Sequence, residues 1–177
     1  MLAEVLLGFV VTGIVVYWII LRVLSKEGKA KISDTERCSW KLKKSKKNQL
    51  IFSATIPIKN DTSIDFTLVD VFTRLQLPEE QYKDGMCRSW IRRAGTNRED
   101  GYWEAMIIPK KTGTTAEIFL IIDAVKSLET TMNNLPDFFI DLYWQIVCRN
   151  PQRIEWQRIR VFADDLREAR EEEGDEA

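Results

Sequence analysis

The chain has 177 residues, 45% of them apolar and 10% aromatic, which excludes a disordered tail and suits one domain of ordinary size beside a short N-terminal segment. The net charge is only −1, but it is unevenly spread. Residues 22–47 carry ten Lys or Arg against three acids, whereas residues 164–177 carry eight acids against two arginines. Such asymmetry usually reflects partners or surfaces, not the fold.

The sequence contains no histidine, which excludes histidine-based acid–base catalysis, catalytic triads and most zinc sites. Cys38, Cys87 and Cys148 lie too far apart to form a CxxC motif. Their odd, sparse number fits a reducing compartment, with each thiol packed as a small hydrophobe, and leaves one disulfide open. We therefore expect no catalytic residue, no metal site and no cofactor, and a protein that is not an enzyme.

The N-terminal segment is strongly apolar: no charge interrupts Val5–Leu21. Its length predicts a single transmembrane helix over residues 1–24. Tyr17 and Trp18 suit the membrane interface, and Arg22 can extend to the headgroups. Because basic residues follow this segment, the positive-inside rule places the N-terminus outside and the rest of the chain in the cytoplasm.

Small residues in the same segment suggest a packing face. Gly8 and Thr12 are four residues apart, and Gly13 lies next to them. Small residues at this spacing let two helices approach closely within a membrane. The helix of another membrane-protein subunit could pack there.

Residues 25–36 are polar and predict a linker, and residues 37–163 predict a β domain. Apolar residues alternate there with period two, and turn residues such as Asp84-Gly85 separate the alternating runs. With no long amphipathic helix, this pattern predicts a mainly β fold, an antiparallel sandwich of immunoglobulin-like type. Residues 164–177 predict a short acidic helix or tail without an apolar stripe. The runs expected to form strands are 51–58, 64–70, 72–77, 102–108, 116–122, 138–149 and 153–163.

The strongest charge cluster follows the linker and consists of five lysines. It could contact an anionic lipid surface or an acidic protein. The alternative is a solvated hairpin with its turn at residues 43–48. A nucleic-acid partner is not expected, because the rest of the chain is not basic. The lysines are Lys41, Lys43, Lys44, Lys46 and Lys47.

A second basic group surrounds Trp90. Arginine and tryptophan together are enriched at the energetically important positions of protein interfaces. This segment therefore predicts a partner-binding loop, and the alternative is an ordinary polar loop. Its basic members are Arg88, Arg92, Arg93 and Arg98.

Four carboxylates stand in or beside apolar runs: Asp65, Asp70, Asp123 and Asp141. Paired buried acids could transfer protons or bind calcium. Nothing in their spacing joins them, and strand alternation places many of them on the wet face. We expect no catalytic role for them.

Together these features predict a non-enzymatic, single-pass membrane protein. Its β-sandwich would be an accessory or assembly subunit that contacts the other subunits of a larger membrane protein complex. The alternative is a tethered module that binds a lipid or another small apolar ligand between its sheets.

Overall fold

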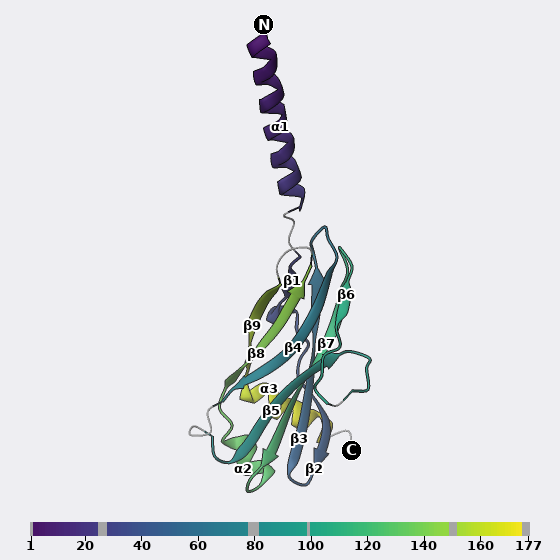
Figure 1. The fold of residues 1–177 in the computed structure, drawn as a ribbon. Coiled ribbons are helices and arrows are strands. Elements are labelled where there is room, and N and C mark those ends of the chain that lie inside the picture. The colour runs from purple at the N-terminus through teal and green to yellow at the C-terminus, as the bar shows by residue number, and fades with distance from the viewer. Residues whose placement is uncertain (1, 25–27, 78–81, 99, 149–151, 175–177) are drawn as a thin grey trace.

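The computed structural model describes the chain except for residues 1, 25–27, 78–81, 99, 149–151 and 175–177. It also leaves undescribed the side chains of residues 2–7, 23–24 and 173–174. The start of the predicted linker and the end of the predicted acidic tail therefore lie outside the described residues. Figure 1 shows two facing layers of strands, with the helix α1 (Leu2–Leu24) extending away from one end.

The first sheet, sheet A, has five strands and contains both basic groups of the sequence. Its order is β1-β3-β7-β5, and β2 pairs with β3 on the same edge as β1. The recorded pairings are all antiparallel. The strands are β1 (Ala30–Ile32), β2 (Lys41–Lys46), β3 (Gln49–Asn60), β5 (Gly85–Arg93) and β7 (Gly113–Ala124).

The second sheet, sheet B, has four antiparallel strands in the order β6-β4-β8-β9. They are β4 (Phe66–Gln76), β6 (Met106–Ile108), β8 (Phe138–Val147) and β9 (Arg153–Val161). The two sheets enclose one core of apolar side chains. Strand alternation produces this core, because Phe52, Ala54, Ile56 and Ile58 of β3 all lie on the predicted inner face and are buried.

The predicted mainly β sandwich with antiparallel sheets is therefore confirmed. The immunoglobulin-like label stays a prediction, although the strand order has a counterpart in that family. The sheets β1-β3-β7-β5 and β4-β8-β9 occupy the places of the ABED and CFG sheets, with β6 added beside β4.

The helix α1 runs from Leu2 to Leu24, close to the predicted bounds of residues 1–24. Among the residues that the structure describes, no helix is both long and apolar enough to cross a membrane. This finding contradicts the transmembrane helix predicted for residues 1–24. It equally contradicts the single-pass membrane localisation with an outside N-terminus and a cytoplasmic domain.

Strand β4 merges two predicted strands into one through a β-bulge. Its register with β8 shifts between Val69 and Phe72, and Asp70 adopts a left-handed backbone with φ of 49°. The extra residue keeps Asp70 exposed and returns Val71 to the core after Leu68. Asp70, the last residue of the predicted strand 64–70, therefore does not face the core.

The C-terminal helix α3 (Ala163–Gly174) is docked on the sandwich and does not project as a frayed tail. Ala163, Leu166 and Ala169 are buried at a spacing of three, which is the apolar stripe that we did not expect. The Arg167 guanidinium donates to the carbonyl oxygens of Met132 and Leu135, each at 3.0 Å. These contacts tie α3 to the end of the short helix α2 (Leu128–Asn133).

Two short elements lie in and around the predicted linker. Strand β1 pairs with the end of β3, with Ala30 and Ile32 buried. The 3-10 helix η1 (Asp34–Glu36) follows and lies near β9, where Asp34 accepts a hydrogen bond from the Arg160 backbone N–H at 3.4 Å. Residues 30–36 are thus part of the folded domain.

Candidate functional site

The outer face of sheet A gathers six cations from β2 and β5, and we call it the basic face. Its orientation follows from β3: because Leu50 and Phe52 point into the core, the alternate positions point outward. Lys41, Lys44 and Lys46 pair with those outward positions. The basic face consists of Lys41, Lys43, Lys44, Lys46, Arg88 and Arg92, with Trp90 between the two arginines.

Glu117 of β7 connects the two basic groups. Its carboxylate accepts hydrogen bonds from Arg92 Nε at 3.0 Å and Nη2 at 2.8 Å, and Lys43 Nζ lies 3.7 Å away. Both hydrogen bonds end on the same carboxylate oxygen, Oε2, and Glu117 is only 9% exposed, so this ion pair is largely shielded from water. Sequence reasoning missed Glu117, because the register between β3, β7 and β5 is needed to bring it beside Lys43 and Arg92.

An aromatic pair supports the same arginine. The rings of Trp90 and Phe119 stack with centroids 4.1 Å apart. The Arg92 guanidinium lies 4.6 Å from the Phe119 centroid and 5.7 Å from that of Trp90. Stacking and the Glu117 pair together hold Arg92 in one place.

Asp123 plays a similar role for Arg88. Its carboxylate accepts hydrogen bonds from Arg88 Nη2 and from Gln49 Nε2, each at 2.6 Å. The basic face thus carries six cations and two carboxylates, Glu117 and Asp123, so four positive charges are in excess (6 − 2 = 4). Within the described part of the chain, Lys41, Lys44 and Lys46 are exposed and form no ion pair.

The residues around Trp90 form β5, an edge strand of sheet A, and not the predicted loop. That they bind a partner stays a prediction. Arg93 is exposed at the end of that strand, and Lys47 is exposed in the turn between β2 and β3. Arg98 lies apart, paired with Asp100 at 2.7 Å. This hydrogen bond holds the pKa of Asp100 at about 2, below its ordinary value of 3.8.

Two contacts within α1 involve residues that the sequence singled out for packing or anchoring. The Thr12 hydroxyl donates to the Gly8 carbonyl oxygen at 2.8 Å, and Arg22 lies over the Trp18 ring at 5.2 Å. A side chain added at Gly8 or Gly13 would have no heavy atom within 4 Å. Tyr17 and the other described apolar side chains of α1 are exposed. The Thr12 hydrogen bond and the Arg22–Trp18 contact both join residues of α1 itself.

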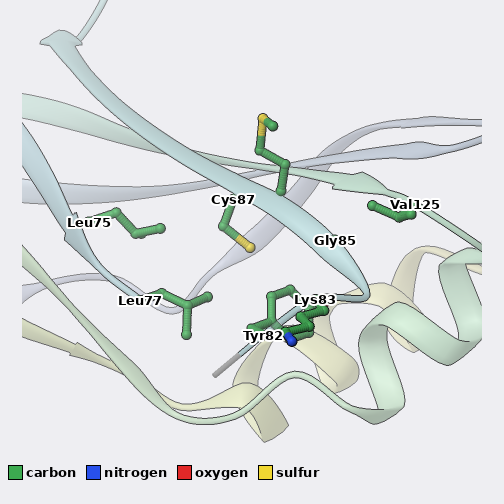
Figure 2. A pocket seen from close by; sticks show the side chains of 8 residues that line it. Leu75, Leu77, Tyr82, Lys83, Gly85, Cys87 and Val125 are labelled. Atoms are coloured by element: carbon green, nitrogen blue, oxygen red, sulfur yellow. The ribbon is translucent and has the colours of Figure 1, made fainter. Parts of the chain in front are cut away.

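A groove of about 600 Å³ lies between β4 and β5 (Figure 2). Leu75 and Leu77 line one side, and Cys87 points into it from β5. Burial, aided by the carboxylate of Asp123, raises the pKa of the Cys87 thiol to about 12. At neutral pH this thiol is protonated, so it is a poor nucleophile.

The four carboxylates considered for catalysis lie apart. Asp141 binds Arg158 and Asp123 binds Arg88, in different sheets. Asp65 accepts a hydrogen bond from the Lys110 backbone N–H at 2.7 Å, and Asp70 occupies the bulge. Among the described residues, no group of three potential ligands could hold a metal ion.

The fold and the basic face define an antiparallel β-sandwich that presents positive charge on one sheet. No family model and no curated protein matches the sequence. Among solved structures, a Bordetella pertussis protein described as ApaA aligns with a TM-score of 0.46 at 9% identity, over 77% of this chain and 95% of that one. The GAE domain of GGA2p from Saccharomyces cerevisiae aligns with a TM-score of 0.38 at 9% identity, over 77% of this chain and 97% of that one. Similarities this weak carry no functional argument.

Proposed function

We propose that the protein is a non-enzymatic accessory subunit that binds an acidic segment of a partner protein on the basic face. The observation that carries this proposal is Glu117, which accepts two hydrogen bonds from Arg92, lies 3.7 Å from Lys43, and so fixes Arg92 on the sheet beside the lysines of β2. Fixed cations lose less conformational entropy on binding than free ones do. Around this centre, the exposed lysines Lys41, Lys44 and Lys46 supply uncompensated positive charge that would attract carboxylates.

The combination of aromatic and basic side chains on the basic face also favours a protein partner. Trp90 and Phe119 provide an aromatic centre, and arginine and lysine surround it. Aromatic residues and arginine are the side chains that contribute most to binding at protein interfaces. An acidic segment with a few apolar residues would match both features.

Fluorescence anisotropy with a short, fluorescein-labelled peptide rich in glutamate and leucine tests this proposal. We expect Lys44→Glu to weaken binding about tenfold at low salt, because it replaces an attraction on the face by a repulsion. Lys110→Glu is the matched control, since Lys110 is equally an exposed lysine but follows β6 in sheet B. The control variant should bind like the unchanged protein.

Equal weakening by the two variants would mean that only net charge matters, and it would count against a site on the basic face. Binding of the peptide that is unaffected by Lys44→Glu would also contradict the proposal. Preference for vesicles of anionic lipid over the peptide would show that the face takes a different kind of partner.

The alternative of an apolar ligand held between the sheets stays a prediction. The space between the sheets is occupied by large buried side chains, Phe52, Phe66 and Phe138 among them. The described grooves open at the surface of the sandwich instead. This arrangement does not favour an enclosed ligand.

A further inference from the structure

The outer face of sheet B carries a row of aromatic side chains, whereas the basic face lies on the opposite side of the sandwich. Residues 72, 143 and 156 are direct partners across β4, β8 and β9, so their side chains form one row. The rings of Phe72 and Tyr143 stack at 5.1 Å, and those of Tyr143 and Trp156 lie 6.4 Å apart. We call the outer surface of β6, β4, β8 and β9 around this row the aromatic face.

Large apolar side chains on the aromatic face are open to solvent. Phe72 is 50% exposed, Trp156 55% and Ile154 70%. Further exposed apolar residues surround them, namely Tyr102, Ile107, Phe139, Val147 and Phe162. From the usual areas of such side chains, these exposed fractions amount to on the order of 800 Å² of apolar surface. Each partner of a stable protein complex buries about this much, and a patch of this size marks an interaction surface.

We propose that the aromatic face binds the same face of a second copy of this chain, as a two-fold dimer. A two-fold contact requires a surface that complements itself. A groove of about 630 Å³, lined by Phe72, Tyr102 and Tyr143 among others, lies beside Trp156, which neighbours Tyr143 in the row and is 55% exposed. Under a two-fold axis, Trp156 of each copy can enter the groove of the other.

The charges of the aromatic face permit this self-association. Three arginines and three aspartates balance on it (3 − 3 = 0): Arg74, Arg158 and Arg160 with Asp70, Asp137 and Asp141. The central pair is already formed, since Arg158 Nε donates to Asp141 at 2.8 Å and Asp141 is only 3% exposed. Covering the face would therefore not bury an unpaired carboxylate at its centre.

The basic face could not associate with itself in this way. Its excess of four positive charges per copy would repel a second copy. A dimer through the aromatic face instead leaves both basic faces open, pointing away from each other on the outside of the assembly. This inference goes beyond the proposed function and does not depend on it, because it rests on the other sheet.

Photo-crosslinking of the full chain tests the dimer. Phe72→p-benzoylphenylalanine places the probe in the row, and equal amounts of ¹⁴N- and ¹⁵N-labelled protein are mixed at micromolar concentration and irradiated. We expect mixed-isotope crosslinks to residues of β4, β8 and β9, identified by mass spectrometry. The isotope mixture shows that the contact joins two copies, and the mapped residue separates it from any contact through α1.

In the chain that carries the probe, Ile154→Asp should reduce the mixed crosslinks at least tenfold, because it places a charge in the buried interface. Val125→Asp is the matched control: Val125 is as exposed as Ile154 but lies beyond the end of β7. That variant should leave the yield unchanged. Crosslinks that are absent, that map outside the aromatic face, or that survive Ile154→Asp would overturn the proposal.

Discussion

At the scale of single residues, the three cysteines show how burial controls the ionisation of a thiol. All three are free, and they differ in exposure: Cys38 is exposed, whereas Cys87 and Cys148 are partly covered. The number and spacing of the cysteines in the sequence do not show which thiol is the most exposed. The position of Cys87 on β5, facing Leu75 and Leu77, makes its thiol resistant to ionisation.

We predict that iodoacetamide at pH 8 alkylates Cys38 far faster than Cys87. With a pKa of about 12, Cys87 has a thiolate fraction on the order of 10⁻⁴ at that pH. Peptide mass spectrometry over a time course measures both rates in the same sample. Comparable rates at the two positions would show that the groove does not shield the thiol, and would reopen a nucleophilic role for Cys87.

Glu117 shows what residue-level reasoning misses. The sequence presents it as an ordinary acid inside an apolar strand. Arg92 lies beside it only because β7 pairs with β5, and Lys43 can reach it only because β2 and β7 pair with opposite edges of β3. The sequence predicted the two basic groups as separate contacts, and the structure joins them through this carboxylate.

At the scale of elements, α3 departs most from the expectation. Charged residues dominate its sequence, so the three buried residues Ala163, Leu166 and Ala169 do not form an obvious apolar stripe. Leu166 is 0% exposed and belongs to the core of the sandwich. The hydrogen bonds of Arg167 to the carbonyl oxygens of Met132 and Leu135 then tie the first half of the helix to the end of α2.

Leu166→Ala should lower the free energy of unfolding by about 2–5 kcal/mol, because it leaves a cavity in the core. The neighbouring Glu168 is exposed, so Glu168→Ala should change it by less than about 0.5 kcal/mol. Urea unfolding followed by tryptophan fluorescence measures both. A Leu166→Ala variant as stable as the control would mean that α3 is not docked in solution.

At the scale of the whole molecule, several exposed carboxylates link stability to pH. A hydrogen bond from Lys59 lowers the pKa of Glu36, and one from Asn134, with a further contribution from Lys126, lowers that of Asp84. The Arg98 hydrogen bond lowers that of Asp100 to about 2. Each carboxylate is thus more acidic in the folded state than in the unfolded chain.

The stability that these carboxylates contribute should therefore be nearly complete above about pH 5.5 and fall as the pH decreases toward 2. Stability falls on acidification because a carboxylate whose pKa is lowered in the folded state stabilises the fold only while it is ionised. The ordinary values of 4.5 for Glu36 and 3.8 for the aspartates set the upper limit of the window. Urea midpoints at pH 7, 4.5 and 3 test this, and Asp100→Asn should flatten the decline at the acid end. A midpoint that rises on acidification would contradict it.

Much of the sandwich was predictable from the sequence. Strands such as β3 and β7 alternate apolar and polar residues, and alternation is a local property that burial on one face imposes directly. β5 was not predictable, since Arg88, Arg92 and Trp90 resemble an interface loop until β7 is placed beside them. The bulge at Asp70 was equally hidden, because it depends on the register with β8.

The sequence by itself determined the two-layer β architecture, the absence of histidine chemistry and the presence of two basic groups. Only the tertiary structure decided that these groups share one face, that Glu117 joins them, and that the opposite face carries Phe72, Tyr143 and Trp156 in a row. The physical reason is the same in each case. Alternation along a strand is local, whereas the neighbours of a side chain across a sheet depend on strand order and register, which residues far apart in the chain decide together.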